Sequence, residues 1–196
     1  MNSRRADSMK VYIVATYTGT TLARMIKRLS DTQYSHISIS LNENLNPMYA
    51  FGRLHPRTPI FAGLVEEHIN EGLYAIKKDT VCRVCELEVT PEQYYMIKSN
   101  LENMWATRKS LSYDAGGLLW FAMNKPRKRG NRFVCSTFVS KTLEDSGIDL
   151  FGKPYYEVQP LDFTKTNKNL KVVYEGLLSE YNINTIALHN QLPYSI

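Results

Sequence analysis

The segment 34–41, YSHISISL, alternates between polar and apolar side chains, and this pattern most restricts what the 196-residue chain can fold into. Successive side chains of a β-strand point to opposite faces of the sheet. Ile37, Ile39 and Leu41 would therefore share an apolar face. The other face would carry the polar residues His36, Ser38 and Ser40. The pattern predicts a strand that buries one face, so the fold should contain a sheet with a core packed against it.

Several other segments are also expected to be strands. The clearest are 10–16, 48–52, 81–89 and 170–174, and less regular candidates are 63–69 and 73–77. The stretch from Arg53 to Pro59 contains two prolines, which interrupt the hydrogen bonding of a sheet. We expect that stretch to be irregular.

Helix boundaries are marked by capping residues. The run TPEQ at 90–93 is a capping box with proline at the first helical position, so it predicts a helix that continues to about Lys109. Asn131 and Gly147 are expected to bound a second helix over 132–146, as N-cap and C-terminal cap. Two further helices are expected at 18–29 and at 113–121.

Length and composition favour one folded domain. A chain of this size with 43% hydrophobic residues can bury a substantial core without metals or disulfides. We expect a single α+β domain over residues 1–196, in which a small, mainly antiparallel sheet packs against helices. Residues 1–9 are expected to form a flexible tail.

The sequence offers neither a membrane span nor a signal peptide. The longest wholly apolar run, 118–123, is much shorter than the roughly 20 residues that a spanning helix needs. Residues 1–10 contain two arginines but no apolar stretch behind them. Three cysteines are an odd number and do not suggest a disulfide framework. We therefore expect a cytoplasmic protein with reduced thiols.

The net charge of +5 arises from one local patch. Its members, which we call the basic patch, are Lys125, Arg127, Lys128, Arg129 and Arg132. Without them the basic and acidic residues balance at 19 each. The patch is expected to be a solvated loop, or alternatively a surface that attracts an anionic substrate or an anionic membrane. No nucleic-acid-binding motif accompanies it, so we expect no nucleic-acid partner.

Cys135 is the strongest candidate for covalent chemistry. It lies in the run RFVCSTFVS, near the start of the helix predicted over 132–146. Unpaired backbone N–H groups and the helix dipole favour the thiolate form at such a position. Phe138 and Val139, one turn later, would place Cys135 at the rim of the buried face, between core and cleft. The alternative is that Cys135 is a small buried apolar residue.

His36 is the natural partner for this cysteine. It occupies the polar face of the strand predicted at 34–41, so it points either to solvent or into a cleft beside Ser38. An imidazole can accept the proton of a thiol and later return it to a leaving group. The alternative is an ordinary surface histidine.

The remaining cysteines and histidines are weaker candidates. Cys82 and Cys85 would lie on opposite faces of a strand, because they are three positions apart and an odd spacing changes the face. The other histidines are His55, His68 and His189. No two of them have the spacing on a helix that would let both bind one metal ion. We therefore expect no metal ion and no cofactor.

Two short motifs, taken in their order along the chain, resemble the permuted papain-like superfamily. SHISI at 35–39 matches its histidine strand, and CSTFV at 135–139 matches its cysteine helix. Ordinary papain-like enzymes carry the cysteine helix first, whereas the permuted branch carries the histidine strand first. This branch includes NlpC-type hydrolases with rearranged chains, YiiX-like amidohydrolases and lecithin–retinol acyltransferase. Residues 113–114 (YD) and 160–163 (PLDF) also resemble segments of these proteins.

The resemblance implies a permuted papain-like fold and a cysteine hydrolase. Cys135 would be the nucleophile and His36 the general base, and a peptide-like amide would be cleaved through an acyl-enzyme. The backbone N–H of Cys135 would help to bind the oxyanion. The residues expected to contact substrate are Tyr113, Asp114, Ser136 and Ser38.

A third polar residue usually orients the histidine in this superfamily, on the strand that follows it. The matching strand here, 48–52, offers only the hydroxyl of Tyr49. Possible substitutes are Glu43, His55 and Glu66. Two alternatives to an amidase stay open: a lipid acyltransferase or lipid hydrolase of the same fold, and a non-catalytic binding module that retains the Cys–His pair. The expected partner is accordingly a small-molecule, peptide or lipid acyl substrate.

Overall fold

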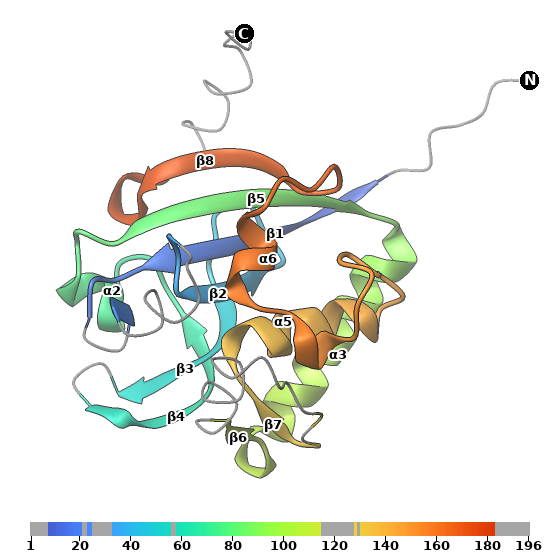
Figure 1. The fold of residues 1–196 in the computed structure, drawn as a ribbon, viewed down its shortest axis with the longest axis horizontal. Helices are drawn as coiled ribbons and strands as arrows, with labels where there is room; N and C mark the ends of the chain where they lie inside the picture. Colours follow the sequence, from blue (N-terminus) through green and yellow to red (C-terminus); the bar gives the residue numbers. More distant parts are fainter. Residues whose placement is uncertain are drawn as a thin grey trace, which may run out of the picture.

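A computed structural model describes residues 8–20, 23–24, 33–55, 58–114, 128 and 130–182, including all their side chains except those of 58–61. Six strands form one antiparallel sheet in the order β4-β3-β2-β1-β5-β8 (Figure 1). Their bounds are β1 (Met9–Tyr17), β2 (His36–Ser40), β3 (Met48–His55), β4 (Thr58–Glu67), β5 (Val81–Val89) and β8 (Lys171–Leu177). The structure confirms an α+β class with a mainly antiparallel sheet.

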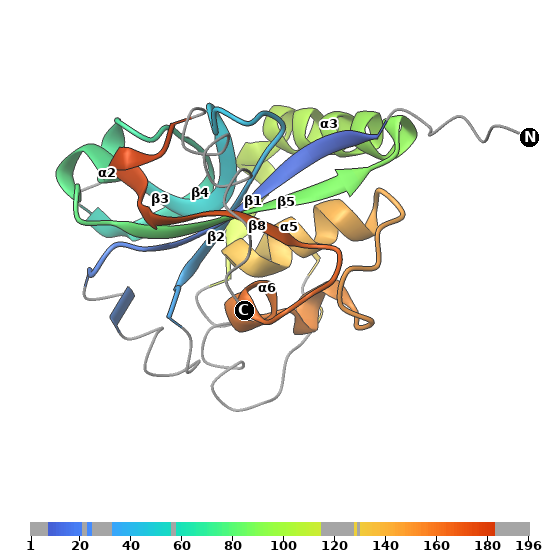
Figure 2. The same ribbon diagram turned by 90° about the horizontal axis from the view of Figure 1, so that it is seen from above.

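The described residues also form helices. They are α2 (Gly72–Ile76), α3 (Pro91–Ala106), α5 (Cys135–Glu144) and α6 (Pro160–Thr164). Helices α3 and α5 lie toward one end, α2 lies toward the other, and α6 lies between them (Figures 1 and 2). Short 3₁₀ turns lie at 108–110, 155–157 and 178–180. None of the helices in these described ranges is long and apolar enough to cross a bilayer.

Strand β1 separates two hydrophobic cores. Val11, Ile13 and Ala15 face the larger core, which α3, α5 and α6 close. Tyr12 and Val14 face the smaller core, together with α2 and the segment after β8. Strand β2 follows the predicted alternation, because its two isoleucines are fully buried in the larger core. Its polar residues point to the opposite face, where they too are largely covered.

Several predicted boundaries are confirmed. The capping box of α3 forms as expected: the Gln93 N–H donates to Thr90 Oγ1 at 3.2 Å, and the Thr90 N–H donates to Gln93 Oε1 at 3.0 Å. Gly147 has a φ of +73°, which favours glycine, and its N–H donates to the Glu144 carbonyl at 3.0 Å. The strand expected at 81–89 matches β5.

The described residues of the region predicted to be irregular, 53–55 and 58–59, instead belong to two paired strands. Strand β3 continues to His55 and β4 begins at Thr58. Pro59 is tolerated because β4 is an edge strand, where a missing N–H removes no hydrogen bond on the open side. The segment 73–77 was predicted to be a strand, but α2 covers most of it. Five residues are too few to distinguish the alternating pattern of a strand from the repeat of a helix.

The helix predicted over 132–146 begins three residues later than expected. Residues 132–133 form strand β7 (Arg132–Phe133), which pairs in parallel with β6 (Ser112–Tyr113), so Val134 and not Asn131 is the N-cap. The helix predicted at 113–121 is wrong at its start for the same reason, and 115–121 lie outside the described residues. Most of 18–29 also lies outside them, although Ala23 and Arg24 are helical. The predicted tail at 1–9 is too long, because β1 includes Met9.

Candidate active site

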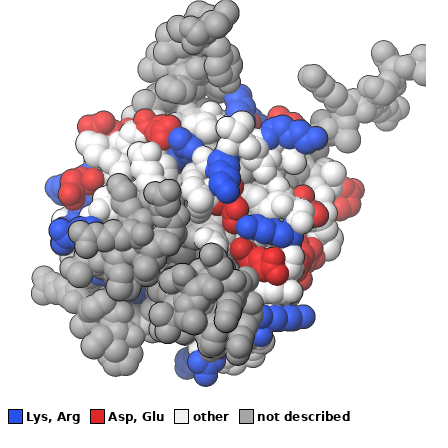
Figure 3. All heavy atoms as spheres, viewed as in Figure 1, with Lys and Arg blue, Asp and Glu red and all other residues white. Residues whose placement is uncertain are grey.

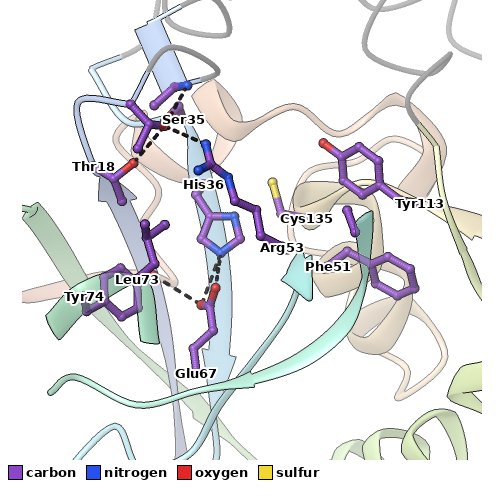
Figure 4. Close-up of a pocket in the computed structure, with 14 residues that line it drawn as sticks. Thr18, Ser35, His36, Phe51, Arg53, Glu67, Leu73, Tyr74, Tyr113 and Cys135 are labelled. Atoms are coloured by element: carbon purple, nitrogen blue, oxygen red, sulfur yellow. Dashed lines mark hydrogen bonds and ion pairs between the residues drawn. The ribbon is translucent and has the colours of Figure 1, made fainter. Parts of the chain in front are cut away.

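Cys135 is the first residue of α5, and the pairing of β6 with β7 places it there. The parallel ladder sets Tyr113 beside Phe133, two residues before the cysteine. Phe138 and Val139 are fully buried in the larger core, so α5 is anchored by its apolar face. The thiol of Cys135 is buried but lines a pocket that it shares with His36 (Figure 4).

His36 lies between this thiol and a carboxylate. Strands β2 and β3 pair at Ile39–Tyr49 and Ser40–Met48, so His36 has no partner on β3. It lies at the end of β2 that is close to Cys135, the first residue of α5 (Figure 4). Its Nε2–H donates to Glu67 at 2.9 Å (Oε1) and 3.1 Å (Oε2). Because Nε2 serves Glu67, the other ring nitrogen, Nδ1, is turned toward Cys135 (Figure 4).

Glu67 is held by three donors from two elements, β2 and α2. Besides the imidazole, the hydroxyl of Ser38 donates to Oε2 at 2.7 Å and the hydroxyl of Tyr74 donates to it at 3.2 Å. Tyr74 lies on α2, and its hydroxyl also lies 3.4 Å from Thr16 Oγ1 on β1. Because these partners fix the carboxylate, the orientation of the imidazole is fixed as well.

The electrostatics of the pair favour a protonated imidazole. Burial by itself lowers the pKa of His36, but the negative charge of Glu67 and the hydrogen bonds to Cys135 and Glu67 outweigh it and raise this pKa well above 6.5. Burial by itself raises the pKa of Glu67, but His36, Ser38 and Tyr74 outweigh it, so the pKa falls below 4.5. The pair is therefore an imidazolium and a carboxylate near neutral pH.

Gly52 on β3 leaves the space that this ion pair occupies. A Cβ at this position would lie 3.2 Å from Glu67 Oε1 and 3.5 Å from His36 Cε1. The first distance is tighter than most real Cβ contacts, so a side chain here would displace the carboxylate or the imidazole. The glycine is thus explained by the close approach of the backbone to the pair.

Two further polar side chains complete the pocket wall near the thiol. Tyr113 reaches it from β6, and burial and the nearby Cys135 raise the pKa of its phenol, against a smaller lowering by Arg53. The phenol therefore stays a neutral O–H donor. Arg53 enters from β3, and its Nη2–H donates to Thr20 Oγ1 at 2.9 Å.

The orienting residue is Glu67, and none of the four residues predicted for that role contacts His36. Glu66 precedes Glu67 on β4 but points to the opposite face, beside its cross-strand partner Tyr49, where burial and the negative charge of Glu66 raise the pKa of the Tyr49 phenol. His55 lies at the exposed end of β3. Glu43 lies in the loop between β2 and β3, and its carbonyl accepts a hydrogen bond from the Tyr181 hydroxyl at 2.5 Å.

The residues predicted to contact substrate divide into two groups. Tyr113 lines the pocket, and its contact with substrate stays a prediction. Ser136 is fully buried, and its hydroxyl donates to the Val158 carbonyl at 2.8 Å, so it holds the segment after α5 instead. Ser38 is also fully buried and serves Glu67. Asp114 is buried outside the pocket lining, with its N–H donating to the Phe133 carbonyl at 2.9 Å.

The other two cysteines lie away from this site. Cys82 is in the smaller core and Cys85 in the larger one, which confirms that the two point to opposite faces of β5. Burial raises the pKa of Cys82 to about 12 and that of Cys85 to about 11. Both are therefore protonated thiols at neutral pH. Within the described ranges, His, Cys, Asp and Glu form no group of three that could hold a metal ion.

The basic patch is described only in part. Lys125, Arg127 and Arg129 lie outside the described residues, and Lys128 and Arg132 are exposed. On the face shown in Figure 3, acidic and basic side chains of the described residues lie interspersed, without a continuous field of one sign. Attraction of an anionic membrane or substrate by the patch stays a prediction.

Comparison with known proteins adds no family to this picture, because no family model matches the chain and a search of curated proteins found no relative.

Replacing Glu67 with glutamine is expected to change how stability depends on pH. The raised pKa of His36 contributes to folding stability. This contribution is complete below pH 6.5 and is lost as the pH rises through the pKa of His36 in the folded protein. The lowered pKa of Glu67 gives a contribution that is complete above pH 4.5 and is lost in more acidic solution. In urea unfolding, the free energy of unfolding should therefore differ most between wild type and E67Q at pH 4.5–6.5. This difference should become smaller as the pH rises above 6.5.

The matched control for this experiment is Glu66→Gln, which changes the neighbouring carboxylate on the opposite face. E66Q should follow the wild-type pH dependence. A difference between wild type and E67Q that is equal at about pH 5.5 and about pH 9.5 would show that the His36–Glu67 ion pair does not form.

Proposed function

We propose that this protein is a cysteine hydrolase that cleaves a peptide-like amide bond through an acyl-enzyme on Cys135. The observation that carries the proposal is the position of the His36 imidazole, between the carboxylate of Glu67 and the thiol of Cys135 in one pocket. A carboxylate that keeps an imidazole protonated beside sulfur favours the thiolate, which is the nucleophilic form.

In the proposed reaction, the thiolate of Cys135 attacks the carbonyl carbon of the bound amide, and the carbonyl π electrons move to oxygen. When the carbonyl re-forms, the C–N bond breaks and His36 gives its Nδ1 proton to the leaving nitrogen. A thioester on Cys135 remains. The neutral imidazole then accepts a proton from water as the water attacks the thioester. This step releases the acid and restores the thiolate and the imidazolium.

Two donors are placed to bind the oxyanion that forms during these steps. The backbone N–H of Cys135 is at the first position of α5, where the helix itself supplies no acceptor. The phenol of Tyr113 is neutral and lines the same pocket. Fixed donors of this kind stabilise the developing negative charge more than water does, because they need no reorganisation.

Two features of the fold support a permuted papain-like arrangement. The histidine strand β2 precedes the cysteine helix α5 in the chain, and α5 packs against β2 and β3 of an antiparallel sheet. One feature departs from the expected pattern, because the orienting carboxylate lies on β4 and not on the strand directly after the histidine strand. In this proposal Glu67 takes the orienting role in spite of its different position.

The proposal is tested by trapping the acyl group on the protein. Incubation with p-nitrophenyl acetate, followed by rapid acid quenching and intact-mass analysis, should show one added acetyl group. Peptide mapping should place it on Cys135, and Cys135→Ser should not acquire it. An acetyl group that is absent, or that is found elsewhere in the protein, would contradict the proposal.

The two alternatives to an amidase give different results in the same assay. A non-catalytic module would leave Cys135 unmodified by every acyl donor. A lipid acyltransferase or lipid hydrolase would acquire a fatty acyl group from phosphatidylcholine vesicles, but would not release p-nitroaniline from N-acetylated amino acid p-nitroanilides. Release of p-nitroaniline that is lost in C135S supports the amidase.

A further inference from the structure

Arg53 extends its guanidinium into the pocket that holds Cys135. Along β3 the side chains of Tyr49 and Phe51 pack on the larger core, the same side of the sheet as α5. Because side chains alternate along a strand, Arg53 shares that side and Gly52 faces the His36–Glu67 pair. Figure 4 shows Arg53 beside His36, with Cys135 and Tyr113 across the pocket.

The guanidinium is held in place by neutral partners. Its Nη2–H donates to Thr20 Oγ1 at 2.9 Å. This oxygen also accepts hydrogen bonds from the Ala23 N–H and the Thr18 hydroxyl, both at 3.3 Å. Arginine has five N–H donors in a rigid fork, so one bond to a threonine leaves capacity for a second partner.

The charges that line the pocket do not cancel. The charged residues among its lining are His36, Glu67 and Arg53. The imidazolium and the carboxylate offset each other, and no carboxylate within the described ranges forms an ion pair with Arg53. The guanidinium also acts on Tyr113 across the pocket, where it lowers the pKa of the phenol against burial and Cys135. The pocket therefore carries one positive charge close to the sulfur when Cys135 is a neutral thiol or a thioester, and the proposed thiolate offsets that charge.

We propose that Arg53 is a specificity-determining residue that selects acyl donors with a carboxylate close to the scissile carbonyl. This inference rests on the proposed function, because it assigns the substrate class of the same site. A guanidinium and a carboxylate form two parallel hydrogen bonds, which fix both the position and the orientation of the substrate. Amides of amino acids or peptides that carry a free carboxylate beside the cleaved bond have this chemistry.

A pair of alkylating reagents tests the inference without knowledge of the substrate. Iodoacetate and iodoacetamide both transfer their methylene carbon to the thiolate of Cys135 and release iodide. Iodoacetate carries a carboxylate where iodoacetamide carries a neutral amide. We expect the iodoacetate-to-iodoacetamide rate ratio at Cys135 to exceed the ratio for glutathione by on the order of tenfold at low salt. Rates are read by peptide mass mapping of Cys135.

Variants assign this preference to one residue. Arg53→Gln should lower the iodoacetate-to-iodoacetamide rate ratio at Cys135 severalfold toward that of glutathione, because only the His36 imidazolium then attracts the carboxylate. Arg53→Lys should give an intermediate ratio, because lysine keeps the charge but lacks the forked pair of N–H donors. Arg108→Gln, which removes an exposed arginine packed on Trp105, should leave the wild-type ratio. A ratio that is unchanged in R53Q overturns the inference.

The imidazolium of His36 also attracts an anion, so its share is measured separately. In His36→Gln the reaction should be slower, but its iodoacetate-to-iodoacetamide rate ratio should still exceed that of glutathione. In the double variant H36Q/R53Q the ratio should equal that of glutathione. Loss of the preference in H36Q alone would overturn the role of Arg53. A wild-type Cys135 that reacts with iodoacetamide no faster than glutathione would instead contradict the proposed function. The two failures are therefore distinguishable.

Discussion

Replacement of His36 by alanine is expected to slow alkylation of Cys135 by iodoacetamide by about a hundredfold near pH 6.5. In the proposed function, the imidazolium that Glu67 stabilises is the hydrogen-bonding cation beside the sulfur, and a Cys135 thiolate would lose this partner in H36A. The measurement is the rate of carbamidomethylation at Cys135, followed by peptide mapping at a series of times. Circular dichroism before alkylation verifies that the variant is folded.

The matched control for this variant is His55→Ala, which removes an exposed histidine at the end of β3. H55A should react at the wild-type rate. Equal rates for wild type and H36A would mean that the imidazole does not influence the thiol, and the active-site arrangement would have to be abandoned.

The second large effect is expected from Glu67→Gln. Glutamine can still accept a hydrogen bond from Nε2–H, but it removes the negative charge that raises the pKa of His36. Because burial lowers this pKa when it is not opposed, the imidazolium should be lost at a lower pH. The rate of Cys135 alkylation near pH 7 should fall about tenfold, since one pKa unit corresponds to a factor of ten.

The pH profile distinguishes this charge effect from a loss of structure. In E67Q the reactive form should persist only at lower pH, so the deficit relative to wild type should grow between about pH 5 and about pH 8. Glu66→Gln should retain the wild-type profile, because its carboxylate lies on the other face of β4. A deficit that is constant across this range would indicate a distorted pocket instead.

The local patterns of the sequence predict the parts of the site that depend on local structure. The alternation at 34–41 places the isoleucines of β2 in the core and His36 on the other face. The cysteine motif lies in a predicted helix, although that helix begins at Cys135 and not at Arg132 as expected. The capping box predicts the start of α3 correctly, because capping involves residues only three positions apart.

The residues that the sequence did not reveal depend on strand register. Glu67 shares a face of the sheet with His36 because it pairs with Met48, which in turn pairs with Ser40 on the strand of His36, and register is not visible in the periodicity of a single strand. Arg53 was overlooked for a related reason, since the prolines that follow it suggested an irregular segment. A signal was nevertheless present, because alternation from the buried Leu64 places Glu66 on the same face as Leu64 and Glu67 on the opposite one.

The roles of the serines could not be predicted from composition either. Ser38 and Ser136 flank the histidine and the cysteine in sequence, which suggested contact with substrate. Both are fully buried, and each hydroxyl serves a protein acceptor, Glu67 in one case and the Val158 carbonyl in the other. Burial of a hydroxyl requires such a partner, and only the packed structure identifies it.

The most direct measurement is the rate at which iodoacetamide modifies Cys135 in the wild-type protein between about pH 5 and about pH 9, relative to glutathione under the same conditions. If the fold brings this thiol to an imidazole that is kept charged by Glu67, the rate should already be high in mildly acidic solution and change little toward neutrality. A rate that rises in step with glutathione over the whole range, or modification only after denaturation, would contradict that arrangement.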